Sequence, residues 1–465
     1  MSDLDVGNFP ALQNSSESSE FGGIIAQKKT QRRDSAASAD VGGAGAPLMP
    51  RTVEETGLDF LFLAELIGKV IFQRGKISLA NLAAHLCLPP VVLNPVLDFM
   101  RSEHLGEIAR RGDSEGDVEY QLTEEGKRRA VEGLRRCQYA GPAPVTLEAY
   151  TREIEHHSVG GLEISAQIVH QQYADLVIAP TILDCFGAAM NSGRAIFVYG
   201  PAGSGKTYMA ERLSRLLGGT VAVPHAIVVD GEVIQVFDPL VHSPVPPAPG
   251  SASLIDRRQQ ADSRWVMCER PVAMTGGELT LSMLDLHFDE STRYYQAPPH
   301  LKANNGIFII DDLGRQLVAP RELMNRWIVP LDRRCDYLAL HTGYKFRVPF
   351  DVVVVFSTNL NPTDLADEAF LRRLGYKIFI GPIPEKDYRL ICERVCADMK
   401  VRFDEAAFTF LVHELHASSG RPLLACYPRD LVGQVRDFAI YEGSERALSE
   451  AALRRAWNTY FVTGA

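Results

Sequence analysis

Three short, continuous apolar runs stand out in the middle of the chain. They are Ala195–Tyr199, Gly306–Ile310 and Val352–Phe356. The first is followed by a glycine-rich segment and the other two by polar residues. An uninterrupted apolar run of this length is typical of a strand buried on both faces of a parallel sheet. In open α/β sheets, ligands bind outside the carboxyl ends of the strands. The pattern therefore predicts a doubly wound α/β core whose functional side chains follow these runs.

The segment before this core changes from helical to strand-like spacing. Apolar residues recur at helical intervals over Leu58–Gln73, Leu79–Leu86 and Val91–Ser102, and strand-like pieces follow at Gly106–Ala109 and Val118–Leu122. Three helices followed by a hairpin resemble a winged helix. We therefore expect a small winged-helix-like α+β domain at residues 56–140.

Composition and periodicity assign the rest of the chain. Residues 1–50 are rich in Ser, Gly, Ala and charge and poor in aromatic residues, which predicts a disordered tail. A Pro-rich boundary then opens a linker helix at 141–158. The core is expected over 159–382, and four further helical segments predict a C-terminal helical lid over 383–465.

Composition also narrows the function classes. The net charge of -10 offers no general attraction to nucleic acid, so any DNA contact has to be local. No apolar run approaches the length of about 20 residues that a membrane helix needs, and the acidic start does not resemble a signal peptide. The eight cysteines contain no CxxC pair. We expect a cytoplasmic protein with reduced thiols and no membrane insertion.

The first apolar run leads into a glycine-rich loop with the spacing GxxxxGKT. Its residues are Gly200, Pro201, Ala202, Gly203, Ser204, Gly205, Lys206 and Thr207. Glycines let the backbone turn tightly and aim its N–H groups at a polyphosphate. A lysine in this position reaches the β and γ phosphates, and the following hydroxyl is placed for Mg²⁺. The loop predicts binding of ATP with Mg²⁺.

The other two runs deliver the remaining groups that phosphoryl transfer needs. Asp311 and Asp312 follow the second run, and Asn359 comes soon after the third. Asp311 is placed to hold the Mg²⁺ shell, and Asp312 to orient and polarise the attacking water. Asn359 is expected to bond the γ phosphate or the same water. The sequence thus predicts a complete ATP hydrolysis site at one sheet edge.

Together these residues resemble the AAA+ ATPase superfamily. In that resemblance Gly200–Thr207 is Walker A, Asp311 and Asp312 are Walker B, and Asn359 is sensor 1. Asp312 departs from the more usual glutamate of the family, which leaves strong hydrolysis in question, although the loader and initiator branches also carry two aspartates.

The resemblance implies further residues and an assembly. Arg372 and Arg373 correspond to the arginine-finger segment, with the choice between them open, and Arg429 corresponds to sensor 2 at the start of a lid helix. Gly160 and Gly161 lie where the family wraps the adenine. An arginine finger acts on the nucleotide of a neighbouring subunit, so the resemblance implies a homo-oligomeric ring, commonly a hexamer.

A hairpin pattern around His341–Gly343 resembles the clade with a hairpin before sensor 1, which includes the MoxR-type chaperones. The long segment between Walker A and Walker B predicts a strand pair, Ala226–Val229 and Val233–Phe237, around an Asp-Gly turn. It also predicts an amphipathic helix at Glu278–Leu286. There is no GAFTGA loop, which disfavours a transcriptional activator.

The sequence therefore favours an ATPase that couples hydrolysis to remodelling of a protein partner of unknown identity. Two alternatives remain open. One is a DNA-associated loader or transposition helper that uses the winged helix on DNA, and the other is a nucleotide-gated switch with little turnover. DNA binding is not favoured, because residues 57–140 hold 11 Lys and Arg against 12 Asp and Glu.

Overall fold

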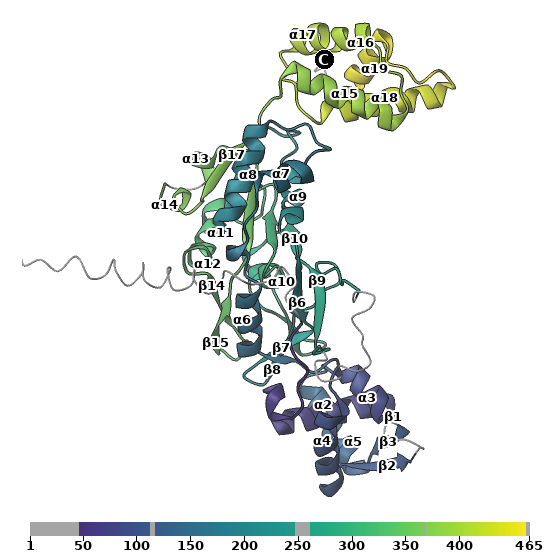
Figure 1. The fold of residues 1–465 in the computed structure, drawn as a ribbon, viewed down its shortest axis with the longest axis vertical. Coiled ribbons are helices and arrows are strands. Elements are labelled where there is room, and N and C mark those ends of the chain that lie inside the picture. Colours follow the sequence, from purple (N-terminus) through teal and green to yellow (C-terminus); the bar gives the residue numbers. More distant parts are fainter. Residues whose placement is uncertain (1–45, 112–116, 247–260, 366–367, 462–465) are drawn as a thin grey trace, which may run out of the picture. The chain divides into compact units, whose positions relative to one another are not determined.

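The computed structural model describes residues 46–111, 117–246, 261–365 and 368–461, so most of the tail predicted at residues 1–50 lies outside the described residues. At the centre is a five-stranded parallel sheet in the order β17-β5-β16-β13-β10 (Figure 1). Its strands are β5 (Ile196–Tyr199), β10 (Val272–Thr275), β13 (Ile307–Ile310), β16 (Val353–Thr358) and β17 (Tyr376–Phe379).

The three apolar runs form the adjacent strands β5, β16 and β13, as the sequence predicted. Alternate residues of each strand belong to two different hydrophobic clusters, one on either face. In β13, for example, Ile307 and Ile309 join one cluster, whereas Phe308 and Ile310 join the other. Burial on both faces explains why these strands show no polar alternation. With the helical C-terminal region, the predicted fold class is confirmed.

The helices that surround this sheet follow the expected pattern, with short breaks. The loop after β5 leads into α9 (Lys206–Arg212) and a 3-10 turn, η4 (Leu213–Leu216). After β13 come two helices, α11 (Pro320–Arg326) and α12 (Ile328–Arg333), separated at Trp327. Before the sheet lie η3 (Val159–Gly161), α7 (Ala166–Gln172) and α8 (Pro180–Ser192), and after β16 come α13 (Pro362–Leu365) and α14 (Glu368–Leu371).

A second sheet, which the sequence did not reveal, is formed mainly by the segment between β5 and β13 and is completed by one strand from the linker. This mixed sheet has the order β11-β12-β8-β7-β4. Its strands are β4 (Val145–Thr146), β7 (Ala226–Val229), β8 (Glu232–Gln235), β11 (His287–Asp289) and β12 (Tyr294–Gln296). A separate antiparallel pair, β6 (Thr220–Pro224) and β9 (Trp265–Glu269), lies in the same segment of the chain, and α10 (Pro299–Lys302) leads into β13.

One strand pair in this segment was predicted correctly and one helix was not. The strands β7 and β8 pair around Asp230 and Gly231, whose positive φ values of 50° and 80° suit a two-residue hairpin turn. The helix predicted at Glu278–Leu286 was wrong, because only the 3-10 turn η6 (Leu281–Leu284) forms. Thr280 and Asp285 are both extended, so a single turn separates them.

The N-terminal region contains the predicted helices and hairpin. They are α2 (Phe60–Arg74), α3 (Leu79–Leu86), α4 (Pro90–Ser102), β2 (Gly106–Arg110) and β3 (Glu119–Leu122), followed by α5 (Glu124–Arg136). Asp59 and Ser78 cap α2 and α3 with their side chains. A third strand, β1 (Lys76–Ser78), pairs with β3 and was missed, since three residues are too few to show a period.

The linker between this region and the core is packed rather than free. β4 pairs in parallel with β7 and leads into α6 (Leu147–His156). Arg264 forms a buried ion pair with Asp262 at 2.7 Å, and its Nη1 donates to the carbonyl oxygens of Thr56 and Pro144 at 3.2 and 3.4 Å. The segment inserted before β13 therefore clamps both ends of the N-terminal region.

The C-terminal helices gather in one bundle (Figure 1). They are α15 (Glu385–Met399), α16 (Glu405–Phe410), α17 (Ala417–Ser419), α18 (Tyr427–Glu442) and α19 (Glu450–Tyr460), with a π-helical turn at Leu411–His416 between α16 and α17. Buried His416 lies at their centre, where its Nε2 meets the Tyr388 hydroxyl at 3.0 Å and its ring packs edge-on against Trp457. The bundle thus has its own core.

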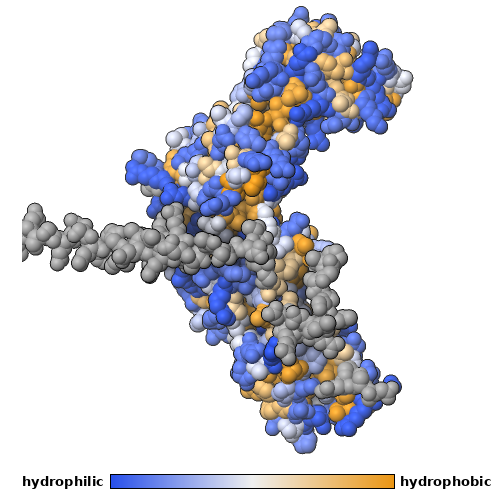
Figure 2. Space-filling model, in the orientation of Figure 1, coloured by the Kyte–Doolittle hydropathy of each residue, from blue (hydrophilic) through white to orange (hydrophobic). Residues whose placement is uncertain are grey.

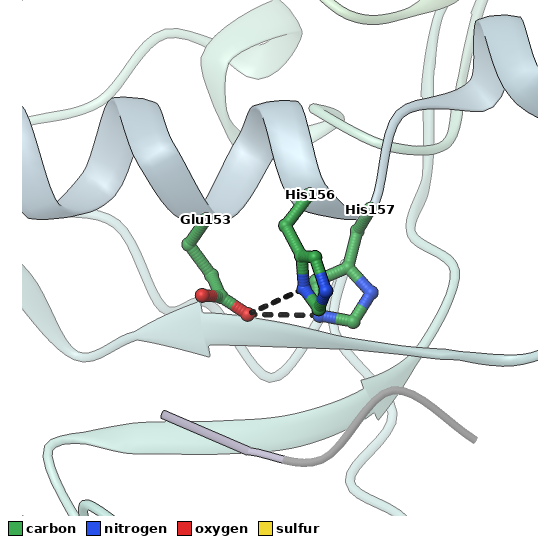
Figure 3. Close-up of side chains that lie close together, drawn as sticks. All are labelled: Glu153, His156 and His157. Atoms are coloured by element: carbon green, nitrogen blue, oxygen red, sulfur yellow. Dashed lines mark hydrogen bonds and ion pairs between the residues drawn. The ribbon is translucent and has the colours of Figure 1, made fainter. Parts of the chain in front are cut away.

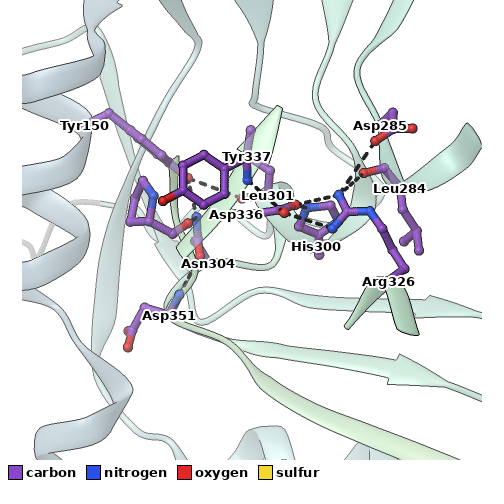
Figure 4. A network of polar contacts seen from close by, with 11 residues as sticks. Tyr150, Leu284, Asp285, His300, Leu301, Asn304, Arg326, Asp336, Tyr337 and Asp351 are labelled. Carbon is purple, nitrogen blue, oxygen red and sulfur yellow. Dashed lines mark hydrogen bonds and ion pairs between the residues drawn. The ribbon is translucent and has the colours of Figure 1, made fainter. Parts of the chain in front are cut away.

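The hairpin expected before sensor 1 is present as β14 (Cys335–Ala339) and β15 (Lys345–Pro349). Its base is fixed by a polar network that extends through the interior (Figure 4). The buried carboxylate of Asp336 accepts hydrogen bonds from both Nη atoms of Arg326, at 2.8 and 2.7 Å, and meets His300 Nε2 at 3.0 Å. These contacts tie the first strand of the hairpin to α10 and α11.

The surface on the face shown in Figure 2 is mostly hydrophilic, with apolar patches between. The most exposed large apolar side chains, Leu240, Leu317 and Tyr441, come from three separate segments. Within the described residues no single helix has the length and apolarity to cross a membrane, although the bent pair α3 and α4 passes on length and composition together.

Candidate nucleotide site

The loop after β5 has a backbone that only glycine accommodates well. Gly200, Gly203 and Gly205 have φ values of 146°, 84° and 92°. A Cβ at Gly200 would lie 2.0 Å from the Ile380 carbonyl oxygen, and one at Gly203 would lie 2.4 Å from Cys426 Sγ. The loop is therefore held closely between β17 and the start of α18, and the glycines of GxxxxGKT are sterically required.

Lys206 lies inside this loop and bonds to it. Its Nζ donates to the carbonyl oxygens of Gly200 and Pro201, at 3.0 and 2.9 Å, and to Asn359 Oδ1 at 2.7 Å. Burial lowers the pKa of this ammonium, while the nearby charges of Asp311 and Asp312 act to raise it. A polyphosphate beside Lys206 would favour its charged form further.

Thr207 and Asp311 form the oxygen pair expected of a magnesium site. Thr207 Oγ1 donates to Asp311 Oδ2 at 2.8 Å, so both oxygens lie at the same point of the sheet edge. Mg²⁺ prefers oxygen ligands of this kind together with water and phosphate oxygens. Ser204 Oγ is buried in the same loop without a hydrogen-bond partner among the described residues. An orphaned hydroxyl beside a glycine-lined turn fits a loop shaped for a ligand.

Asp312 is turned toward Asn359 by an unusual backbone. Its φ of 48° lies in the left-handed region, which non-glycine residues rarely adopt, and such strain concentrates at functional sites. Asp312 Oδ1 accepts from Asn359 Nδ2 at 3.2 Å. Since the other end of the same amide accepts from Lys206, three predicted residues form one continuous chain of hydrogen bonds.

These groups open into a cavity of about 670 Å³. Its polar end contains the loop, Asp311, Asp312 and Asn359, and its apolar end is lined by Leu176–Ile178 together with Ile391 on α15. A site with an apolar end and a polar end is suited to a ligand with a planar base and a polyphosphate.

Three arginines line the same cavity. Arg429 on α18 was predicted as sensor 2, whereas Arg315 and Arg394 were not identified. Arg315 follows the Walker B strand by only a few residues, which is a signal that could have been used. Arg394 is one of several charged residues on α15, and its Nη1 donates to the Asp175 carbonyl oxygen at 2.7 Å. Nothing in the sequence distinguishes Arg394 from its neighbours.

The structure does not bring the remaining predicted residues to this cavity. Gly160, in η3 with Gly161, lines a different hollow that includes Ser158 and Asp351. It also lies near Gly193, which precedes β5 and is therefore at the amino end of the sheet. The apolar wall Leu176–Ile178 takes the place beside the cavity that the sequence assigned to the two glycines.

Arg372 and Arg373 also lie at the amino end of the sheet. They line a hollow of about 600 Å³ with Arg194 and Arg334. Arg372 pairs with exposed Glu368 at 2.9 Å, and Arg373 pairs with Asp332 at 2.8 Å. Neither arginine lines the cavity of about 670 Å³ that contains the glycine-rich loop. Each has a carboxylate partner, so these contacts do not decide which of the two corresponds to the arginine finger.

Comparison with known proteins gives one partial family match. Residues 384–459 match the model of a family described as a domain of unknown function (DUF8689). This range begins just before α15 and ends within α19. A search of curated protein sequences finds no match.

Several solved structures are similar over most of the chain. A mutant of Thermotoga maritima RuvB is 12% identical, with coverage of 65% of this chain and 72% of that one and a TM-score of 0.35. NtrX from Brucella abortus in complex with ADP is 13% identical, with coverage of 74% and 68% and a TM-score of 0.39. T. maritima RuvB, described as a Holliday junction branch migration motor, is 13% identical, with coverage of 64% and 70% and a TM-score of 0.33. Similarity this low does not bear on activity.

Proposed function

We propose that this protein is a Mg²⁺-dependent ATPase of the AAA+ type. The observation that supports it is a group of side-chain hydrogen bonds at the carboxyl edge of the sheet. Lys206, Asn359 and Asp312 form one hydrogen-bonded chain, and Thr207 bonds to Asp311 beside it. The strand order β17-β5-β16-β13-β10 puts the phosphate-binding loop between the strand of Asn359 and the edge strand β17.

Each residue has a distinct task in this proposal. Lys206 neutralises phosphate charge, and the loop amides orient the phosphates. Asp312 accepts the hydrogen bond of the attacking water and positions it, while Asn359 fixes the direction of the Asp312 carboxylate. Thr207 and Asp311 would hold Mg²⁺, which when bound supplies charge neutralisation at the phosphates. Among the described residues, Asp312 is connected to Lys206 only through the side-chain amide of Asn359.

The position of the finger arginines favours a shared site. Arg372 and Arg373 lie at the opposite end of the sheet from the cavity of their own chain. They can serve catalysis only at the site of another copy. A closed ring, such as a hexamer, satisfies this requirement for every subunit. We therefore include a homo-oligomeric ring in the proposal.

In this proposal, ATP hydrolysis is coupled to the remodelling of a protein partner. The hairpin β14–β15 is anchored to α11, the helix that follows Walker B, through Asp336 and Arg326. A change at the nucleotide can therefore be passed to the hairpin through packed, hydrogen-bonded elements. In this proposal the N-terminal region, with helices α2 to α5 and the sheet β1-β3-β2, is a winged-helix-like domain and serves as the docking module.

The test is release of γ-phosphate from ATP by the purified full-length protein. Lys206→Ala should abolish ATP binding, and Asp312→Asn should retain binding while lowering turnover by roughly 10² to 10⁴-fold, the range for loss of a positioned base. Lys386→Ala, which removes an exposed lysine at the start of α15, is the matched control and should leave turnover unchanged. Activity that survives Lys206→Ala would refute the site assignment. Tight ATP binding without phosphate release would instead support a nucleotide-gated switch.

One observation favours the alternative of a DNA-associated ATPase. Arg74, Lys76, Arg110 and Arg111 line a single hollow on the N-terminal region, and none of the four has an ion-pair partner among the described residues. Asp117 and Glu119 line the same hollow and reduce its positive charge. Binding to duplex DNA that weakens with salt and with Arg110→Ala, together with DNA-stimulated ATPase activity, would support this alternative.

A further inference from the structure

The last turn of α6 carries a group of side chains that the nucleotide site does not use. Glu153, His156 and His157 occupy positions i, i+3 and i+4, which lie on the same face of a helix. Figure 3 shows both imidazole rings turned toward the carboxylate of Glu153. The three side chains therefore converge although they come from a single helix.

The donor atoms meet at one point. Glu153 Oε1 lies 2.8 Å from His157 Nε2 and 4.0 Å from His156 Nδ1, and the donor atoms of the three residues all lie within 4.8 Å of one another. Two ligand atoms of a tetrahedral zinc ion with bonds of about 2.0–2.2 Å are roughly 3.4 Å apart. Binding therefore requires Glu153 and His157 to separate slightly from their 2.8 Å contact and the exposed His156 to rotate inward.

Burial divides this group into a fixed part and an open part. The side chain of His157 is 3% exposed and that of Glu153 is 15% exposed, whereas His156 is 58% exposed. Two ligands are thus held by the protein, and the third closes the site from the solvent side. Water can occupy the remaining coordination positions, as in metal sites with three protein ligands.

A helix-capping ion pair is the simpler explanation for part of this arrangement. An i, i+4 contact between Glu153 and His157 needs no metal, and it stabilises the end of a helix by itself. It does not explain why Nδ1 of His156 also faces the same carboxylate oxygen. An exposed imidazole at a helix end could equally point into solvent.

We propose that Glu153, His156 and His157 bind a divalent transition-metal ion such as Zn²⁺ or Co²⁺. Two imidazoles with one carboxylate suit these ions, whereas Mg²⁺ and Ca²⁺ prefer sites made only of oxygen. The metal stabilises the end of α6 directly before Ser158 and Val159. Those two residues bond to Asp351 through Ser158 Oγ and Val159 N, both at 2.8 Å.

The test is titration of chelator-treated, nucleotide-free, full-length protein with Co²⁺ in excess Mg²⁺, which occupies the oxygen-only sites. The visible spectrum of Co²⁺ distinguishes nitrogen and oxygen ligands from cysteine thiolates, which matters because all eight cysteines are free. One equivalent should bind with nitrogen and oxygen ligands, and Zn²⁺ should displace it.

His156→Ala is the decisive variant, because this exposed side chain can be removed without disturbing the fold. It should weaken Co²⁺ binding by at least about tenfold, the effect expected for loss of a metal-site group. His413→Ala is the matched control, since His413 is 60% exposed and also faces a glutamate, Glu385, at 3.4 Å. Binding that is absent in the unaltered protein, or unchanged by His156→Ala, would overturn the proposal.

Discussion

Replacing Asp336 with asparagine should destabilise the base of the hairpin far more than its single lost charge suggests. The Asp336 carboxylate is 3% exposed, and it accepts from Arg326, His300 and the backbone N–H of Tyr337. The asparagine amide keeps one acceptor oxygen and points an N–H₂ group at other donors. Removing one partner of a buried ion pair costs about 3–5 kcal/mol, mostly because the remaining charge is left unpaired.

The lower end of that range applies here. The Arg326 side chain is 21% exposed, and it retains Asp285 at 3.6 Å and the Leu284 carbonyl oxygen at 3.1 Å (Figure 4). We therefore expect a loss of about 3 kcal/mol in the free energy of local unfolding. Asp285→Asn is the matched control. It removes a carboxylate from the same arginine, but Asp285 is 63% exposed, so the loss should stay below about 1 kcal/mol.

Trp327 reports on this region, because its ring lies 5.7 Å from that of His300 and 5.9 Å from that of Phe350. In a background in which Trp265 and Trp457 are replaced by phenylalanine, urea unfolding followed by fluorescence isolates the transition around Trp327. Equal losses for Asp336→Asn and Asp285→Asn, or no loss for Asp336→Asn, would refute the reasoning.

Three further predictions follow from the described contacts. Burial acts to raise the pKa of Asp336, but bonds from His300 and Arg326 outweigh it and lower the pKa from 3.8 to about 2. The free energy of the unfolding transition followed at Trp327 should therefore be at its full value above pH 4 and fall by about 2 kcal/mol as the pH drops to about 2. A transition insensitive to pH in this range would contradict this prediction. Gly203→Ala should weaken ATP binding at least about tenfold, measured with a fluorescent analogue, because the new Cβ meets Cys426 Sγ and the φ of this residue is positive. Adding Cys426→Ala should restore only part of the affinity. Full recovery would show that backbone strain is unimportant. Arg264→Leu should leave buried Asp262 unpaired and destabilise the protein by about 3 kcal/mol. Because Arg264 also bonds to the carbonyl oxygens of Thr56 and Pro144, amide exchange near these residues should become faster. Unchanged exchange there would show that Arg264 does not hold the ends of the N-terminal region.

The central strands and the glycine-rich loop could be located from sequence because each has a strong local signature. A strand buried on both faces shows as a continuous apolar run, and GxxxxGKT has a fixed spacing. In the structure Thr207 of this loop bonds to Asp311. The sequence also located the hairpin β14–β15 and the turn at Asp230 and Gly231.

The missed features depend on contacts between distant segments. The mixed sheet joins β4 from the linker to strands more than 80 residues away, and strands of two to four residues carry no period of their own. The apolar wall Leu176–Ile178 of the cavity has no recognisable motif. Gly160 and Gly161 were assigned to the adenine from the family resemblance, and in the structure Gly160 lines a different hollow.

The parallel pairing of β4 with β7 limits how this protein can be divided into fragments. Ala143, in the Pro-rich boundary, is only 1% exposed, and its N–H donates to the Leu86 carbonyl oxygen at 2.8 Å. A fragment that starts after Thr146 would lose an edge strand and leave β7 with unpaired backbone groups, which invites association between chains. Recombinant fragments of the core with the parallel sheet should therefore keep Val145, and even those will expose apolar side chains that α3 normally covers.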